Sequence, residues 1–239
     1  MSGTGTIVNV LAVILGSCIG LVFNGGLKQR FQDTLMQALG MATIFIGASG
    51  ALKGMLAVNG TSLEVGGTMI MIISLVIGSL IGEAINIEQK MENAGLWLKS
   101  RIKTGKGSET FVEGFVTASL VTCVGAMAVV GSLQDGLTGD AAMLYTKSIL
   151  DFVIVIIFSS TLGIGVLFSA IPLGLYQGGI TLFAGFIEPF MSEQMISNLS
   201  FVGSILIFGI GVNLAFDKKI KVGNMLPSIL VVIVCSLFL

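Results

Sequence analysis

The chain has 239 residues, of which 54% are hydrophobic and only 10% are charged, and its formal net charge is −1. A soluble domain carries about a quarter charged residues, so this composition excludes an ordinary soluble protein and favours a membrane protein. The sequence has no histidine, which removes the commonest metal ligand and the usual proton shuttle at neutral pH. We expect the lipid bilayer as a partner, and we expect no cofactor, no bound metal and no nucleic acid.

Eight mainly apolar segments follow one another along the chain. A helix needs about 20 such residues to cross the hydrocarbon core, and a segment in lipid must pair its own backbone polar groups. The sequence therefore predicts an all-α fold, a polytopic transmembrane helix bundle of about seven to eight spans in a single membrane domain, residues 1–239. The sixth segment is glycine-rich and the eighth is short, so either could be re-entrant. The segments are Thr6–Phe23, Thr34–Leu52, Gly67–Ile87, Phe111–Ser132, Ile149–Phe168, Pro172–Ile187, Ser200–Phe216 and Val222–Leu239.

The basic residues predict the orientation of these segments. Cytoplasmic loops of membrane proteins are enriched in Lys and Arg. Ten basic residues fall in alternate loops on one side, whereas the other side holds only Lys53, and Lys147 lies at the start of the fifth segment. This asymmetry predicts that both termini lie outside and that the basic loops are cytoplasmic. The ten residues are Lys28, Arg30, Lys90, Lys99, Arg101, Lys103, Lys106, Lys218, Lys219 and Lys221.

The predicted outer loops are acidic. Such a field would concentrate cations at the outer surface and favour a cation as the solute. Alternatively, the carboxylates only keep the loops hydrated. The acidic residues concerned are Glu64, Asp135, Asp140, Glu188 and Glu193.

An internal repeat joins the first and third segments. Residues 5–24 and 67–86 align without gaps and share seven of twenty residues, mostly glycines and a terminal asparagine, Asn24 and Asn86. Residues 5–54 and 67–136 are therefore probable repeat units, a construction common in transporters. Small residues at i, i+4 spacing also form seams on these helices, which indicate close helix packing or, alternatively, the wall of a pathway. The glycines of these seams are Gly16, Gly20, Gly78, Gly82, Gly114 and Gly125.

Lys147 and Asp151 are the strongest candidates for function. They stand one helical turn apart, so they can pair on one face of a helix. Charged residues inside a membrane are costly and commonly face a partner or a wet cavity. In the alternative, Lys147 reaches the outer surface from the end of its helix and Asp151 follows it. We expect the pair to line a polar cavity, with Gln134, Asp135 and Gln177 nearby.

Other polar residues have weaker claims to a pathway. Asp140 closes the loop 132–140, whose oxygens could hold a cation or only form a turn. Gln177 lies where glycines interrupt the sixth segment, which suggests a site built from unwound backbone. Asn213 is an amide within the seventh segment that needs partners. Glu113 is near a cytoplasmic helix end, where solvation at the interface explains it equally well.

A basic, amphipathic segment, residues 87–106, follows the third span. Its part 87–102 places five apolar residues on one face, with Trp97 beside them. This pattern is typical of a helix that lies in the membrane interface and is attracted to anionic lipid.

Several runs of the sequence resemble one known family. The run from Phe111 to Asp140, with LYTKSILDF, STLGIGVLFSAIPLGLYQGGITL and IKVGNMLP further along, resembles the bacterial YdfK/YqgA-like membrane proteins, a family of unknown function (DUF-554). The resemblance extends over essentially the whole chain. It implies a multi-pass protein of the bacterial inner membrane that is often described as a transporter, and it supplies no catalytic residues.

Three functions are compatible with these observations. Charges within the membrane, interrupted helices and repeats favour a transporter or channel for a small ion or polar solute. A non-transporting membrane scaffold or assembly protein, whose seams join helices or subunits, is the alternative. An enzyme is not expected, because the chain lacks the H-E-x-x-H and G-x-S-x-G motifs and a G-x-G-x-x-G between a strand and a helix. We also expect a homo-oligomer.

Overall fold

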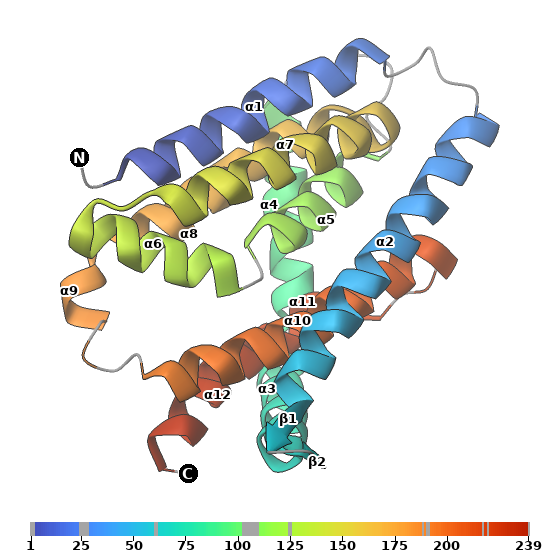
Figure 1. Ribbon diagram of the computed structural model, residues 1–239. Helices are drawn as coiled ribbons and strands as arrows, with labels where there is room; N and C mark the ends of the chain where they lie inside the picture. The colour runs from blue at the N-terminus through green and yellow to red at the C-terminus, as the bar shows by residue number, and fades with distance from the viewer. Residues whose placement is uncertain are drawn as a thin grey trace. The chain divides into compact units, whose positions relative to one another are not determined.

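The computed structural model describes residues 3–23, 29–59, 62–101, 110–123, 126–187, 189, 192–216, 218 and 220–238. Helices dominate this part of the chain, so the expected all-α class is confirmed (Figure 1). Seven residues singled out above lie outside the described residues: Asn24, Lys28, Lys103, Lys106, Gly125, Glu188 and Lys219. The elements are α1 (Thr4–Phe23), α2 (Gln29–Met55), β1 (Leu56–Asn59), β2 (Ser62–Val65), α3 (Thr68–Ile85), α4 (Ile87–Arg101), α5 (Phe111–Cys123), α6 (Ala126–Thr138), α7 (Ala142–Leu162), the 3-10 helix η1 (Gly163–Ser169), α8 (Ala170–Leu182), α9 (Ala184–Ile187), α10 (Glu193–Phe216), α11 (Val222–Met225) and α12 (Pro227–Phe238).

Length and apolar composition qualify five helical stretches of the described chain as membrane spans, or six if a bent pair is one span. The expected number of seven to eight spans is therefore not confirmed. The difference arises because residues 142–182 count as one stretch, although the chain reverses direction at η1 between α7 and α8, and because the last apolar helix is short. The five stretches are Thr4–Phe23, Asp33–Met55, Thr68–Ile85, Ala142–Leu182 and Glu193–Phe216.

The predicted segment Phe111–Ser132 is helical in both halves but is not one continuous helix. The chain is bent by 60° between α5 and α6, so this segment is a broken helix. The two halves pack on different neighbours: α5 contacts mainly η1, whereas α6 contacts mainly α8 and α7. Because each half has its own packing surface, the bend lets both of them bury their small-residue faces.

The structure also corrects the expected interruption of the sixth segment. The helix α8 continues through Gly178 and Gly179 without unwinding. The irregular backbone lies before it, in η1, where Gly163 has a φ of 77°, which glycine adopts without steric cost. A side chain at Gly165 would overlap the carbonyl oxygen of Phe111. Pro172 falls in the first turn of α8, where a missing N–H group leaves no hydrogen bond unmade.

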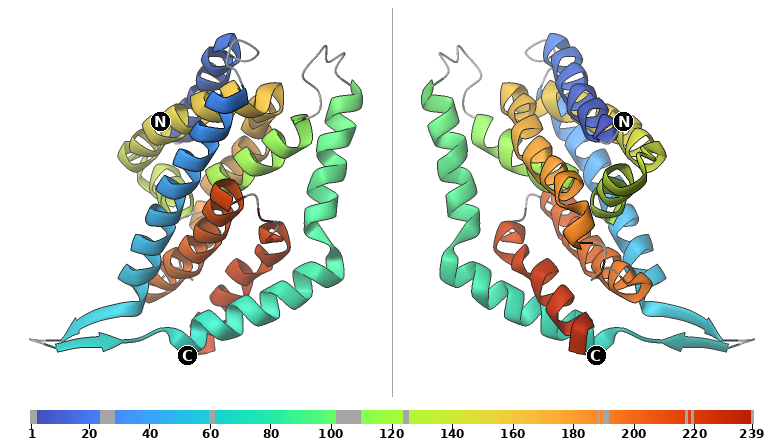
Figure 2. Two further views of the ribbon diagram at one scale, coloured as in Figure 1. Left: turned by 90° about the vertical axis from the view of Figure 1, so that its right-hand side faces the viewer. Right: turned by 90° about the vertical axis from the view of Figure 1, so that its left-hand side faces the viewer.

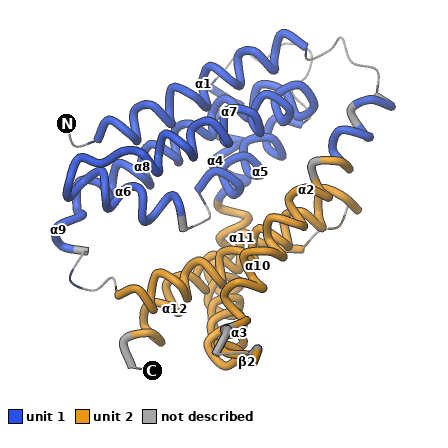
Figure 3. Tube along the Cα trace, in the orientation of Figure 1, with its two compact units in different colours: residues 1–36, 91–190 blue, residues 37–90, 191–239 orange. Residues whose placement is uncertain are grey.

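The chain forms two compact units, residues 1–36 with 91–190 and residues 37–90 with 191–239 (Figure 3). In the first unit, α1 packs along α7 and also contacts η1 and α8. In the second unit, α3 packs against α12, and α12 contacts α10. A cluster of Met195, Leu199, Val202 and Val232 forms an apolar core of this second unit.

Glycine seams lie at helix crossings in both units. A side chain at Gly16 would place its Cβ 2.7 Å from the carbonyl oxygen of Phe152 in α7, and one at Gly20 would overlap the carbonyl oxygen of Ile156. In the second unit, side chains at Gly78 and Gly82 would overlap the backbone at Ser228 and Asn224, and in the first unit the Cβ at Gly114 would lie 3.1 Å from Leu162. Small residues let helix backbones approach this closely. The repeat itself stays a prediction, although its matching glycines serve the same packing purpose in α1 and α3.

A β-hairpin that the sequence analysis did not anticipate leads from α2 into α3 (Figure 2). The strands β1 and β2 are antiparallel, with Leu56 opposite Val65 and Asn59 opposite Ser62. The amphipathic segment after α3 forms the helix α4, as its pattern predicts. Trp97 of α4 is 58% exposed, and the guanidinium of Arg101 lies 5.5 Å from the centre of its ring. The contact of α4 with lipid stays a prediction.

Candidate functional site

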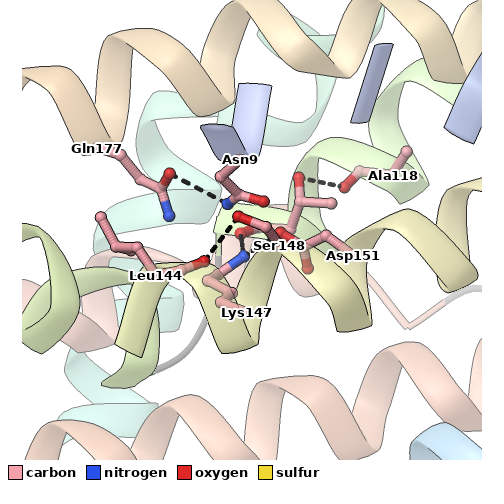
Figure 4. Close-up of polar contacts among 8 residues, drawn as sticks. Asn9, Ala118, Leu144, Lys147, Ser148, Asp151 and Gln177 are labelled. Atoms are coloured by element: carbon pink, nitrogen blue, oxygen red, sulfur yellow. Dashed lines mark hydrogen bonds and ion pairs between the residues drawn. The ribbon is translucent and has the colours of Figure 1, made fainter. Parts of the chain in front are cut away.

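Lys147 and Asp151 form an ion pair inside the first unit (Figure 4). Their side chains are only 7% and 6% exposed, so Lys147 does not extend to the surface from the end of its helix. At 1.5 Å per residue, Lys147 lies about 7.5 Å and Asp151 about 13.5 Å from the start of α7, which is about 31 Å long. The pair is therefore placed well within a stretch that is long enough to span a membrane.

The broken helix supplies a second partner for Lys147. Its ammonium nitrogen donates a hydrogen bond of 2.8 Å to the carbonyl oxygen of Thr122. Thr122 is in the last turn of α5, where backbone carbonyls have no partner within the helix and carry the negative end of the helix dipole. The bend after α5 thus exposes a carbonyl that stabilises the buried ammonium. Sequence alone could not show this, because Thr122 and Lys147 are 25 residues apart.

Two buried carboxamides lie beside the ion pair. The Asn9 side chain of α1 donates a hydrogen bond of 3.1 Å to the Gln177 side chain of α8, and both residues are fully buried. The Asn9 side chain also interacts with the Asp151 carboxyl group. Within the described residues, Asn9 Oδ1 and Gln177 Nε2 have no hydrogen-bond partner. If the oxygen and nitrogen of both carboxamides are exchanged, Gln177 donates to Asn9 instead, and one acceptor and one donor still have no hydrogen-bond partner.

These unmatched groups are energetically costly. A buried donor or acceptor without a partner costs about 1–3 kcal/mol. Natural proteins pair most buried polar groups, so exceptions call for an explanation such as a bound molecule or a functional role. Here one acceptor and one donor are both unpaired beside a buried ion pair, which is an arrangement suited to a small polar solute.

A second set of polar groups borders the cluster on the side of the α1 N-terminus. The hydroxyl groups of Thr6 and Thr181 are 3.3 Å apart. Thr181 also donates a 3.2 Å hydrogen bond to the carbonyl oxygen of Ser132 in α6. Ser148 of α7 is satisfied within its own helix, since it donates to the Leu144 carbonyl oxygen. The polar groups therefore come from α1, α5, α6, α7 and α8.

Asp135 has structural partners at the start of α1. It is fully buried, and its two carboxylate oxygens accept the backbone N–H groups of Gly3 and Gly5, at 3.2 and 3.0 Å. This carboxylate stabilises the positive end of α1. Asp135 is consequently not an exposed charge of an acidic outer face.

The remaining candidate residues are exposed or make contacts of their own. Gln134 and Glu113 are exposed on α6 and α5. Asp140 is exposed and accepts the backbone N–H of Ala142 at the start of α7. In the second unit, the Asn213 side chain makes two hydrogen bonds with the backbone of Ile220, which fix the connection after α10. A place on the pathway stays a prediction for these four residues.

Asn9 is the site residue that the sequence analysis missed. The signal was present, because Asn9 is the only carboxamide in the otherwise apolar run of α1, and an amide in a membrane helix needs partners. The internal repeat drew attention to the glycines of α1 instead. No group of three or more His, Cys, Asp and Glu residues suited to a metal ion occurs in the described part of the chain.

The second unit carries its own polar contacts, at the junction of α3, α4 and α11. Lys221 and Asn224 both donate to the Glu83 carboxylate at 2.7 Å. The Asn224 side chain accepts the Glu88 N–H, and the Glu88 carboxylate accepts the Gly223 N–H. The hydrogen bond and the charge of Glu83 raise the pKa of Lys221. All of these groups satisfy one another, so this network holds the junction together.

Comparison with known proteins identifies the family. The model of the family described as "Protein of unknown function (DUF554)" matches residues 4–237. The chain is 34% identical over 227 residues to "Uncharacterized membrane protein YdfK" of Bacillus subtilis, and 30% identical over 231 residues to "Uncharacterized protein YqgA" of Escherichia coli. Each alignment covers 95% of this chain and 93% of the relative. No solved structure matches the chain. The protein is therefore a helical membrane protein that belongs to the DUF554 family.

Proposed function

We propose that this protein moves a small ion or polar solute across the membrane, and that the solute binds at the cluster formed by Asn9, Lys147, Asp151 and Gln177. The observation that supports the proposal best is the pair of unmatched carboxamide groups beside the buried ion pair. The charges of this cluster are costly in lipid, and charges within membrane helices commonly mark substrate pathways.

The broken helix adds a second argument. In many transporters, discontinuous helices meet at the substrate site and present helix ends to it. Here the end of α5 presents the Thr122 carbonyl to Lys147. Because the cluster is shielded from solvent, a solute can reach it only if the surrounding helices part. That requirement suits alternating access or a gated channel.

Several finer expectations belong to this proposal. The acidic loops favour a cation, and Glu64, Asp140 and Glu193 are exposed among the acidic residues concerned. The basic loops favour outward termini and a bacterial inner-membrane location. The proposed process involves no covalent chemistry, so the protein would not be an enzyme, and a homo-oligomer remains the expected assembly. The alternative, a membrane scaffold, would use the same glycine seams without any flux.

The proposal is tested with purified protein in liposomes. The entry of ions and of polar solutes is compared between the wild type, Asp151→Asn and the control Asp33→Asn, whose carboxylate is exposed near the start of α2. Flux should be lost in Asp151→Asn and kept in Asp33→Asn, while both variants elute as folded protein. A folded Asp151→Asn protein with full flux would refute the role of the cluster. A folded wild type that moves none of the tested solutes would instead favour the scaffold.

A further inference from the structure

One face of α1 carries a polar, an apolar and a second polar residue in succession. Asn9, Val13 and Ser17 follow at steps of four, so they lie on one side of the helix. All three are fully buried. The same order occurs in reverse in Gln177 and Leu173 of α8 and Ser169 at the end of η1, and these residues are also fully buried. The two faces therefore have matching patterns.

The contacts of α1 with α8 bring these patterns into register. Asn9 is bonded to Gln177, and Thr6 meets Thr181. A Cβ built on Gly174 would lie 3.3 Å from Val10. The helices are thus antiparallel, and a step of four residues along either one is about 6 Å. The register places Val13 level with Leu173, and Ser17 level with Ser169.

The helix α7 packs on α1 as well and runs parallel to it. The Cβ built on Gly16 lies 2.7 Å from Val155, and the Cβ built on Gly20 lies 2.8 Å from Ser159. Val155 thus falls at the level of Gly16 and Ser159 at the level of Gly20, so neither lies level with Val13. Lys147 and Asp151 lie about two turns and one turn before Val155, and the Asn9 side chain interacts with the Asp151 carboxyl group. The helix α7 therefore supplies the charges beside Asn9.

Three layers result where α1 packs against α8 and the end of η1. The first is the charged cluster, the second consists of Val13 and Leu173, and the third consists of Ser17 and Ser169. In the third layer, the hydroxyl groups of Ser17 and Ser169 have no hydrogen-bond partner within the described residues. These two buried hydroxyls repeat the feature seen in the first layer, namely polar groups without partners.

We infer that the solute path runs between α1 and α8, that the layer of Val13 and Leu173 closes it, and that the solute is a polar molecule without net charge. This inference rests on the proposed function and gives it a route and a substrate class. An apolar constriction between polar regions gates by excluding water. The solute would pass from the charged cluster to the serine layer when this constriction opens.

The charge of the path determines the substrate class. In the first layer the charges of Lys147 and Asp151 cancel, and the two carboxamides have one donor and one acceptor without hydrogen-bond partners. The serine layer offers only hydroxyl groups, which cannot replace the charge-stabilising environment that an ion loses with its water. A zwitterion or a neutral polar molecule matches both layers, because it carries donors and acceptors and no net charge. The path therefore argues against the cation that the acidic loops favour.

The gate is tested with Leu173→Ser, and Leu175→Ser is the matched control on the same helix. Leu173 is fully buried, whereas Leu175 is 75% exposed. Liposomes that contain each protein are placed in iso-osmotic glycine, a zwitterion, or in iso-osmotic potassium chloride, and their swelling is followed by light scattering. Because a hydroxyl would hydrate the apolar layer, Leu173→Ser should admit glycine several-fold faster than Leu175→Ser. Potassium chloride should enter at the same rate with both variants.

The outcomes separate the gate, the substrate class and the proposed function. Equal acceleration of potassium chloride and glycine by Leu173→Ser would overturn the uncharged class. Unchanged glycine entry in a folded Leu173→Ser protein would overturn the position of the gate. If Leu173→Ser does not fold, Val13→Thr takes its place, since threonine has nearly the shape of valine and Val13 is fully buried in the same layer. The proposed function is tested separately, by the flux through the wild type and Asp151→Asn. Its failure is therefore distinguishable from failure of the gate or of the uncharged class.

Discussion

Removing one or both charges of the buried pair separates a binding role from a packing role. Breaking a buried ion pair by removing one partner costs about 3–5 kcal/mol, because it leaves an uncompensated charge. In Asp151→Leu, Lys147 keeps its 2.8 Å hydrogen bond to the Thr122 carbonyl, so we expect a loss near the lower limit, about 3 kcal/mol. For a chain of this size, that loss corresponds to a melting temperature lower by about 6–12 °C.

The double variant Lys147→Met with Asp151→Leu should recover most of this stability. Replacing a buried pair by apolar residues of similar volume is often neutral or stabilising. The melting temperature of the wild type, Lys147→Met, Asp151→Leu and the double variant is measured in detergent, and flux is measured on the same four preparations. A binding role predicts that the double variant is as stable as the wild type and still transports nothing.

Two results would refute this reasoning. If the double variant regains both stability and flux, the pair only holds α5 and α7 together, and the solute binds elsewhere. If Asp151→Leu alone melts like the wild type, the pair is not buried as the structure has it. Gln134→Leu is the control for stability, since substitution of this exposed residue within α6 should change stability by less than about 0.5 kcal/mol.

Other predictions concern packing and orientation. Gly16→Leu should lower the yield and the melting temperature far more than Leu15→Ala, because Gly16 meets α7 and Leu15 is 58% exposed; equal behaviour of the two would count against the seam. Asp135→Ala should destabilise the protein by about 0.5–2 kcal/mol, the usual loss for a helix N-terminal cap, and a melting curve like that of the wild type would contradict this role. A cysteine at Thr138 should be labelled from the periplasm of intact cells and one at Ser100 should not; periplasmic labelling at Ser100 would overturn the orientation.

Local patterns were sufficient to predict the helices and the pairing of Lys147 with Asp151. Both depend on residues that are close in sequence, since the pair needs only i, i+4 spacing on a helix. The break between α5 and α6 was not predicted, because it depends on the packing of each half against α7, η1 and α8. The helix α8 was expected to unwind at Gly178, but glycine is tolerated inside a helix when the backbone hydrogen bonds are kept.

Contacts between distant parts of the chain decide the composition of the site. Asn9 and Gln177 are 168 residues apart, and their hydrogen bond depends on the antiparallel packing of α1 and α8. The same is true of Asp135, which loop composition placed on an acidic surface and which instead receives the N-terminus of α1. A polar residue in an apolar run shows that a partner is needed, but the run itself does not identify that partner.

The packing of α1 indicates which wall of the apolar layer can move. Gly16 and Gly20 bring the backbone of α1 against carbonyl oxygens of α7, so these two helices are locked by backbone contact. On α8, side chains built at Gly178 and Gly179 would meet no atom within 4 Å in the described chain, and a Cβ at Gly174 would approach only a side-chain atom of Val10, at 3.3 Å, and no backbone. Opening of the layer should therefore occur by movement of α8 away from the rigid pair α1–α7, which is why Leu173 of α8 is the residue substituted in the gate experiment.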